Sequence, residues 1–370
     1  MPCQPRNRGG RIDALIRQPA DRDPDWAEVA WLTDSAAHRA DTREANRTMS
    51  DDVAMPRSHA KRDRRSLKRR LEVLKLPVLP LTHHGYLEPT DRSEWPDEPE
   101  AVGVGPEGMA YAVWRHSRDA RRKQVTSHVG GSDIATAVEV KSDLRVWFVQ
   151  SLPEGRLLLA AARRSDGAAP NAEVWSDGGE LLLTGDLGDA IEELMTTPAG
   201  SVWVGYFDEA LGGSGPQGHG LARFTPDLSP DWLYPINAGL PPVFDCYTLN
   251  VHAERAYICP YTDFHLISIA DGKAVDLGVA PHRSAHGLLM RGGEGAFLGG
   301  WGPEYDLVTP IRITREGVET FGSQCRIVMP DGTEAQGLRY TFRGDTLHAF
   351  HRGTWYVVTL NDLFAANARG

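Results

Sequence analysis

The chain has 370 residues, of which 41% are hydrophobic, and its formal net charge is −10. Residues 1–75 hold 17 Lys and Arg against 12 Asp and Glu, whereas residues 76–370 hold 23 against 38, so the larger part is acidic. An acidic body repels phosphate backbones, and we therefore expect no nucleic-acid partner. The frequent Gly (38) and Pro (25) favour an all-β fold with many turns.

Other features of the composition predict the cellular setting. No stretch reaches the roughly 18 apolar residues of a membrane span, and the N-terminus lacks the apolar region of a signal peptide. The cysteines (Cys3, Cys246, Cys259 and Cys325) have neither zinc-like nor disulfide-framework spacing. We expect a monomeric cytoplasmic protein with reduced thiols, no membrane partner, no bound metal and no cofactor.

Residues 1–75 differ from the rest of the chain. They are polar and show no sustained period over residues 1–55, which predicts a disordered extension, partly basic. An alternative is that Met49 or Met55 is the true start. Residues 57–75 hold nine Lys or Arg, and Leu67, Leu71 and Leu74 have the spacing of one helical face. This segment is either a solvated basic linker or a short helix that touches an acidic surface, such as the body that follows.

A repeat of 40 to 54 residues fills the body. Six apolar segments align, and a short apolar run and a turn precede each of them, as in Pro106-Glu107-Gly108 and Pro153-Glu154-Gly155. The aligned segments are Met109–Arg115, Arg156–Ala162, Ser201–Phe207, Arg255–Tyr261, Gly295–Trp301 and Asp345–His351. Four strands per unit indicate propeller blades, with each aligned segment as the second strand. Residues 76–370 are therefore predicted to form a six-bladed β-propeller.

Two columns of the alignment predict how the blades pack. The third position is large and apolar (Tyr111, Leu158, Trp203, Tyr257, Phe297, Leu347), and the fifth is small (Val113, Ala160, Gly205, Cys259, Gly299, Ala349). Both positions lie on one face of a strand, so a large residue followed by a small one suits packing between neighbouring sheets. For closure of the ring, we expect Trp355–Leu360 to pair with Pro77–Leu81 in the last blade.

Three motifs carry a resemblance. Val202–Glu209 (VWVGYFDE), Asp245–Asn250 (DCYTLN) and Tyr261–Phe264 (YTDF) resemble signatures of a group of uncharacterised bacterial proteins, over about residues 100–365. This resemblance implies a propeller-like fold and no particular activity. Gly103–Gly108 matches the pattern G-x-G-x-x-G, but a strand is expected after it instead of the helix that a dinucleotide site requires.

The candidate site follows from propeller geometry. Ligand sites lie on the top face, which carries the loops from second to third strands and from one blade to the next. We expect aromatic and acidic ligand-binding residues there, namely Phe207, Asp208, Glu209, Asp245, Tyr261, Asp263, His286, Trp301, Tyr305 and His351. Rings and carboxylates suit a polar, cationic or carbohydrate-like ligand. Catalytic residues cannot be identified from the spacing.

The expected function is a binding or interaction module for a small molecule or a protein segment. The alternative is a lactonase-like or lyase-like enzyme that uses the acids, with or without a divalent cation such as calcium. A third possibility is a scaffold that uses the sides of the blades.

Overall fold

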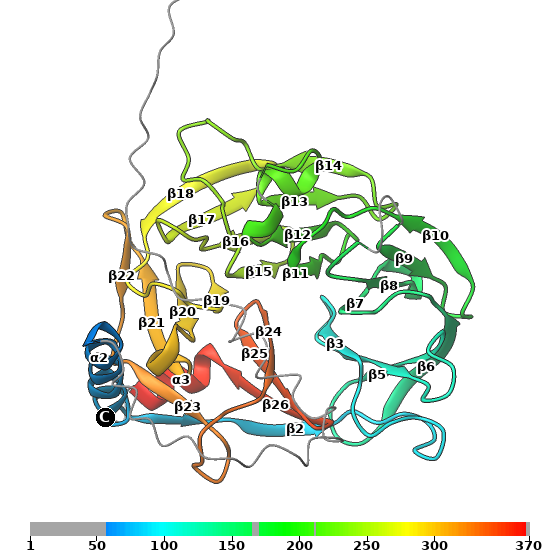
Figure 1. Cartoon of the computed structure of the whole chain (residues 1–370), viewed down its shortest axis with the longest axis horizontal. Helices are drawn as coiled ribbons and strands as arrows, with labels where there is room; N and C mark the ends of the chain where they lie inside the picture. Colours follow the sequence, from blue (N-terminus) through cyan, green and yellow to red (C-terminus); the bar gives the residue numbers. More distant parts are fainter. Residues whose placement is uncertain (1–56, 165–169, 211, 368–370) are drawn as a thin grey trace, which may run out of the picture. The chain divides into compact units, whose positions relative to one another are not determined.

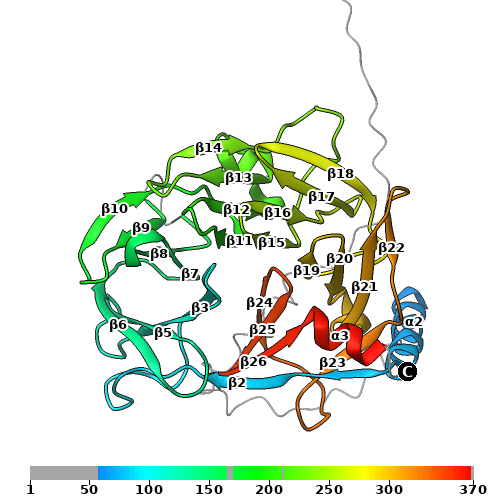
Figure 2. The same cartoon turned by 180° about the vertical axis from the view of Figure 1, so that it is seen from behind.

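The computed structural model describes residues 57–164, 170–210 and 212–367. Residues 1–56, which hold most of the expected extension and both alternative starts, lie outside the described residues. The body is a six-bladed β-propeller, as the repeat predicts (Figures 1 and 2). The innermost strands contact one another in sequence around the ring, from β3 through β7, β11, β15, β19 and β24 back to β3.

The first three blades are antiparallel meanders of four strands each. Blade 1 contains β3 (Ala101–Val104), β4 (Ala110–Arg115), β5 (Arg122–His128) and β6 (Ile134–Lys141). Blade 2 contains β7 (Phe148–Ser151), β8 (Leu157–Ala160), β9 (Ala172–Trp175) and β10 (Leu181–Gly185). Blade 3 contains β11 (Ile191–Thr196), β12 (Val202–Tyr206), β13 (Leu221–Phe224) and β14 (Pro230–Leu233).

The other three blades complete the ring. Blade 4 contains β15 (Leu249–His252), β16 (Arg255–Ile258), β17 (His265–Ala270) and β18 (Lys273–Val279). Blade 5 contains β19 (Gly287–Arg291), β20 (Glu294–Leu298), β21 (Leu307–Ile313) and β23 (Cys325–Val328), and β22 (Val318–Thr320) pairs with β21. Blade 6 contains β24 (Arg339–Arg343), β25 (Thr346–His351), β26 (Thr354–Thr359) and β2 (Thr82–Tyr86). The second strands, β4, β8, β12, β16, β20 and β25, are the six segments that the sequence aligns.

The ring closes with strands from both ends of the sequence, but not with the pairing that we expected. The strand beside β26 is β2, whereas β1 (Val78–Pro80), within the expected run 77–81, pairs in parallel with β23 of blade 5. Leu79 and Leu81 are buried in the core cluster shared by blades 5 and 6. The N-terminal run thus crosses from one blade to the next, because its buried leucines fit the seam between them.

The residues of both packing columns are buried, as packing between neighbouring blades requires. A Cβ atom added to Gly205 would lie 2.5 Å from Sγ of Cys246, at the start of the next blade, so this position must be small. Gly299 is small for a different reason, since its φ of +82° lies in the left-handed region that favours glycine.

Side chains also close the centre of the ring at the end where the innermost strands finish. Arg343 of β24 is buried, and it donates hydrogen bonds of 2.9 Å to the carbonyl oxygens of Val104 in blade 1 and Thr196 in blade 3. Asn250 of β15 donates to the carbonyl oxygens of Leu288 (2.7 Å) and Gly344 (3.0 Å). The bonds of Arg343 connect blades that are not neighbours in sequence, and those of Asn250 connect blade 4 to blades 5 and 6.

Two helices accompany the strands in the described part of the chain, and neither is long and apolar enough to cross a membrane. The helix α3 (Leu360–Asn367) follows β26 and packs its Leu360 and Leu363 into the core. The helix α2 (Arg57–Val73) occupies part of the segment that we expected within a disordered extension, and it belongs to the same compact unit as the propeller.

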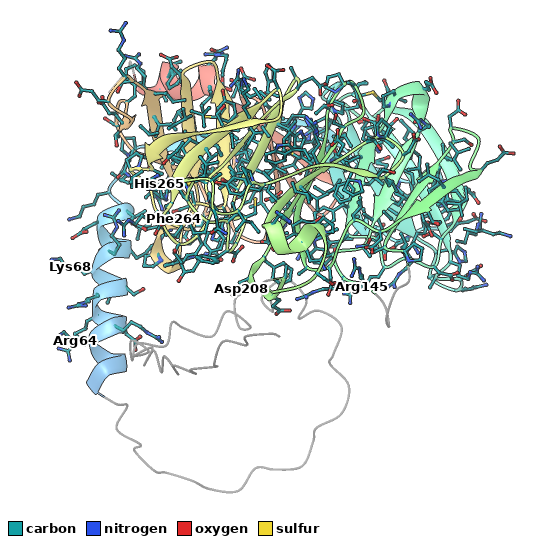
Figure 3. All side chains as sticks on the ribbon, turned by 90° about the horizontal axis from the view of Figure 1, so that it is seen from above. Arg64, Lys68, Arg145, Asp208, Phe264 and His265 are labelled. Carbon is teal, nitrogen blue, oxygen red and sulfur yellow. The ribbon has the colours of Figure 1, made fainter. Side chains whose placement is uncertain are left out.

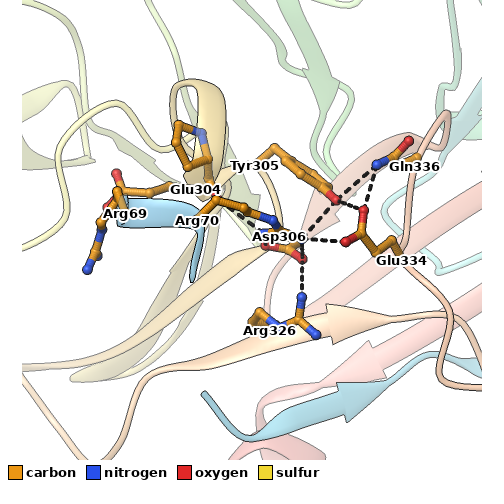
Figure 4. A network of polar contacts seen from close by, with 9 residues as sticks. Arg69, Arg70, Glu304, Tyr305, Asp306, Arg326, Glu334 and Gln336 are labelled. Atoms are coloured by element: carbon orange, nitrogen blue, oxygen red, sulfur yellow. Dashed lines mark hydrogen bonds and ion pairs between the residues drawn. The ribbon is translucent and has the colours of Figure 1, made fainter. Parts of the chain in front are cut away.

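Helix α2 contacts blade 5 through arginines, not through its leucines. Arg70 forms a bidentate pair with Asp306 (2.7 and 3.1 Å) and also bonds Glu334 at 3.0 Å (Figure 4). The side chain of Asp306 is fully buried and bonds Arg326 as well. Leu67 and Leu71 remain 61% and 53% exposed. The helix alternative is therefore the one that the structure bears out, with the acidic propeller as the surface it touches.

Candidate functional site

The top face of the propeller carries the predicted site loops. Asp208 follows β12, the second strand of blade 3, in the short helix η3 (Asp208–Ala210), and Arg145 precedes β7, the innermost strand of blade 2. Figure 3 shows both residues at the same edge of the propeller. This arrangement agrees with the geometry from which the sequence-based site was inferred.

The three signature motifs meet in one place, between blades 3 and 4. The amide of Cys246 donates to the carbonyl oxygen of Tyr206 at 2.9 Å. The amide of Tyr261 donates to the carbonyl oxygen of Asp245 at 3.0 Å, and the Thr248 hydroxyl accepts from the amide of Cys259. The close approach of Gly205 to Cys246 fixes the spacing of the two blades. The motifs are thus parts of a single structural unit.

An aromatic cluster, formed by Tyr247, Tyr261, Phe264, His286 and Trp301, lies where blades 4 and 5 meet on the top face. The Tyr247 ring is at its centre, with its centroid 5.8 Å from that of Tyr261, 5.7 Å from that of His286 and 6.2 Å from that of Trp301. Tyr247, Tyr261 and Trp301 are only partly buried. Tyr247 lies two residues before the innermost strand β15 and His286 directly before the innermost strand β19, so the cluster borders the central mouth of the ring.

The carboxyl group of Asp245 adjoins this cluster. Burial, assisted by the negative charges of Glu192 and Asp208, raises its pKa to about 8. Its Oδ1 atom is buried and accepts no hydrogen bond. Glu192 can be reached by water yet is enclosed by protein on most sides, and this desolvation raises its pKa. The surroundings of Asp245 and Glu192 therefore disfavour the ionised forms of both carboxyl groups. We call this region, between Asp245, Glu192 and the aromatic cluster, the acidic corner.

Four of the ten predicted residues thus come together, and the others do not join them. Asp245, Tyr261, His286 and Trp301 form or adjoin the aromatic cluster. Asp208 lies near enough to raise the pKa of Asp245.

The remaining predicted residues have other contacts. Phe207 lies under the guanidinium of Arg163, 4.2 Å from its ring centroid, and Arg163 also pairs with Glu209. Asp263 is exposed and accepts a bond of 3.4 Å from the neighbouring Thr262.

Tyr305 and His351 also lie apart from the cluster. The Tyr305 hydroxyl accepts a bond from Arg70 at 3.0 Å and donates to Glu334 at 2.7 Å, so this residue belongs to the contact with α2 (Figure 4). His351, at the end of β25, bonds the carbonyl oxygen of Gly337 at 3.3 Å through Nδ1.

Sequence reasoning missed Tyr247, Phe264 and Glu192. Tyr247 and Phe264 stand inside the DCYTLN and YTDF motifs, and that position is the signal that could have identified them. Glu192 lies outside the three motifs. It comes near Asp245 only in the folded structure, because the two residues belong to consecutive blades.

The chemistry that the site offers is limited. Across the described ranges, no three His, Cys, Asp or Glu side chains are grouped so that they could hold a metal ion. Burial and nearby carboxylates raise the pKa of the Cys246 thiol well above its usual value, so this group stays protonated. Desolvation by the surrounding protein lowers the pKa of His286, although the residue remains accessible to water.

Comparison with known proteins adds only distant structural likeness. No protein-family model matches the chain, and no curated protein matches it. A gluconolactonase from Xanthomonas campestris is 13% identical over 76% of this chain and 97% of its own, with a TM-score of 0.42. BamB from Moraxella catarrhalis is 11% identical over 70% of this chain and 85% of its own, with a TM-score of 0.39. A protein of unknown function from Bacteroides caccae is 15% identical over 49% and 67%, with a TM-score of 0.35. At these values we draw nothing about activity from them.

Proposed function

We propose that this propeller is a binding module for an organic cation, held on the top face between the aromatic cluster and Asp245. The observation that carries the proposal is that the ring-lined corner contains a carboxyl group with a pKa of about 8 and an unpartnered Oδ1. A positive ligand would supply the counter-charge that favours the ionised form of this carboxyl group. Partly exposed Tyr and Trp rings favour quaternary ammonium groups through cation–π attraction.

Electrostatics favours a cation over an anion or a neutral sugar. Glu192 and Asp208 both act on Asp245 with negative charge, which would repel an anionic ligand. The acidic body adds a long-range field that attracts cations to the protein. A neutral sugar would gain nothing from either effect.

The proposal extends to the resembling proteins. All three signature motifs supply residues to this corner or to its backbone frame, including Asp245, Tyr247, Tyr261 and Phe264. We therefore propose that the chain belongs to the bacterial group with these signatures, and that the motifs mark a shared ligand site.

The test is isothermal titration calorimetry with choline and with its neutral isostere 3,3-dimethyl-1-butanol. We expect choline to bind and the alcohol to bind at least about tenfold more weakly, because only the charge differs. Equal affinity for both, or no heat with either, contradicts the proposal.

Two matched variants locate the site. Asp245→Asn keeps the shape but cannot ionise, so at about pH 9, where the wild-type carboxyl group is charged, it should weaken choline binding about tenfold or more. Asp263→Asn changes an exposed carboxylate two residues beyond Tyr261 and should leave the affinity unchanged. Equal losses in the two variants would indicate general charge attraction instead of a defined site.

A further inference from the structure

A cavity of about 780 Å³ lies between blades 1 and 2, away from the aromatic cluster. Its walls include Glu107, Pro153 and Pro198, from turns that join first to second strands, so it opens on the bottom face. These turns are the Pro-x-Gly repeats of the first three blades, for which the proposed function has no use. The volume is within the range of small-molecule sites, about 300–1,000 Å³.

One side of the cavity holds a fixed carboxylate. Glu107 accepts a hydrogen bond of 2.5 Å from the Tyr111 hydroxyl and one of 2.8 Å from the Ser151 hydroxyl. Burial, together with Glu107, raises the pKa of Tyr111, so this phenol stays protonated and donates. Two bonds leave the carboxylate capacity to accept more, because an ionised carboxylate has about four acceptor positions.

Another wall holds a guanidinium. Arg156 donates from Nε to the carbonyl oxygen of Pro153 at 3.1 Å, which ties the side chain to its own turn. Within the described part of the chain no carboxylate pairs with it, although Asp177 lines the same cavity. Its terminal donors can therefore receive an anionic group in the planar, bidentate geometry that guanidinium prefers.

Apolar side chains line the cavity together with these two charged groups. Met109, Val138, Leu152 and Leu157 line the cavity, and the last three are less than 10% exposed. A ligand that pairs with Glu107, with Arg156 and with the apolar side chains would carry one positive group, one negative group and an apolar part.

We propose that this cavity binds a zwitterion with apolar side chains, in the class of free amino acids and short peptides. The ligand ammonium group bonds Glu107, its carboxylate bonds Arg156, and its side chains lie against the leucines. The site is separate from the cation site of the top face in both residues and chemistry.

The probes are the dipeptide Leu-Leu, its N-acetyl form, which lacks the ammonium group, and its C-terminal amide, which lacks the carboxylate. Calorimetry with the full chain should show Leu-Leu binding, and each capped form should bind about tenfold more weakly or worse. Equal affinities for the three, or no binding of Leu-Leu up to about 10 mM, overturn the proposal.

Variants assign each contact. Arg156→Gln should remove the preference for Leu-Leu over the amide, and Glu107→Gln should remove the preference for Leu-Leu over the N-acetyl form. Asp245→Asn, on the top face, should change none of these affinities. If Arg156→Gln folds, as judged by circular dichroism, yet keeps the preference for the free carboxylate, the assignment is wrong, and this holds even if Glu107→Gln fails to fold.

Discussion

The guanidinium of Arg343, on the innermost strand of blade 6, donates a hydrogen bond of 2.8 Å to Oε1 of Gln150, on the innermost strand of blade 2. The same oxygen accepts from the Thr196 hydroxyl at 3.1 Å. Burial lowers the pKa of Arg343 to about 10, which leaves it charged at neutral pH. The side chain of Arg343 thus connects blade 6 to blades 1, 2 and 3 by hydrogen bonds at the centre of the ring.

Replacement of Arg343 should lower the stability of the protein considerably. Arg343→Met keeps the length but leaves buried acceptors without donors, so we expect the free energy of unfolding to fall by about 3 kcal/mol. Arg291→Met removes an arginine with a largely exposed pair to Asp345 and should cost less than about 1 kcal/mol. Urea denaturation of both variants measures the difference. Similar losses in the two would show that the ring does not depend on Arg343.

The contact between blades 3 and 4 predicts a coupled pair. Gly205→Ala places a methyl group 2.5 Å from Sγ of Cys246 and should cost about 1–3 kcal/mol. Cys246→Ala in the same chain removes the sulfur, so the double variant should recover part of this loss. Thermal or urea denaturation of the four proteins of the cycle gives the coupling energy. Additive losses would mean that the two positions do not touch.

The Asp245 carboxyl group makes stability depend on pH in a defined direction. Its pKa is about 8 in the folded state and 3.8 ordinarily, so between these values the unfolded chain ionises while the folded one keeps its proton. Asp245 therefore destabilises the fold increasingly as pH rises from about 4 to 8.

The stability of Asp245→Asn relative to wild type should increase by about 1–2 kcal/mol from pH 4 to pH 9. This is less than the full shift of the Asp245 pKa implies, because the side chain is partly solvated. Denaturation curves at the two pH values measure it. A gain for Asp245→Asn at pH 4 that disappears at pH 9 would reverse the sign and refute the argument.

The docking of α2 depends on Arg70. Arg70→Gln breaks the bidentate contact with buried Asp306, and the free energy for local opening of α2 should fall by about 1–3 kcal/mol. Hydrogen exchange of the α2 amides should accelerate accordingly. Lys68→Gln, on the exposed side of the helix, is the control and should leave exchange unchanged. Equal exchange in both variants would show that Arg70 does not hold the helix.

The sequence predicts the blades well because each blade is built from local contacts. The aligned strands occupy equivalent positions in all six sheets, since a turn and a hairpin define each of them within a few residues. The closing strand was harder to assign, because residues 77–81 and 82–86 are both extended and only the seam between blades 5 and 6 distinguishes them.

The candidate site was predictable only in part. Asp245, Tyr261, His286 and Trp301 belong to recognisable loops, so the strand alignment placed them on the top face. The hydrogen bonds of Arg343 to residues 104, 150 and 196 form only when the ring closes, so no local sequence pattern predicts them. The same holds for the cavity between blades 1 and 2, whose walls come from separate repeats.

The central claim is that an organic cation binds beside Trp301, and the most direct measurement is a titration of choline followed through the indole N–H signals of ¹⁵N-labelled protein. The chain has ten tryptophans, and a Trp301→Phe variant identifies the signal of interest. We expect the Trp301 signal to shift with choline, while those of buried Trp114 and Trp355 stay in place and the neutral isostere shifts none. A Trp301 signal that does not move at saturating choline, or that moves equally with the isostere, would contradict the account.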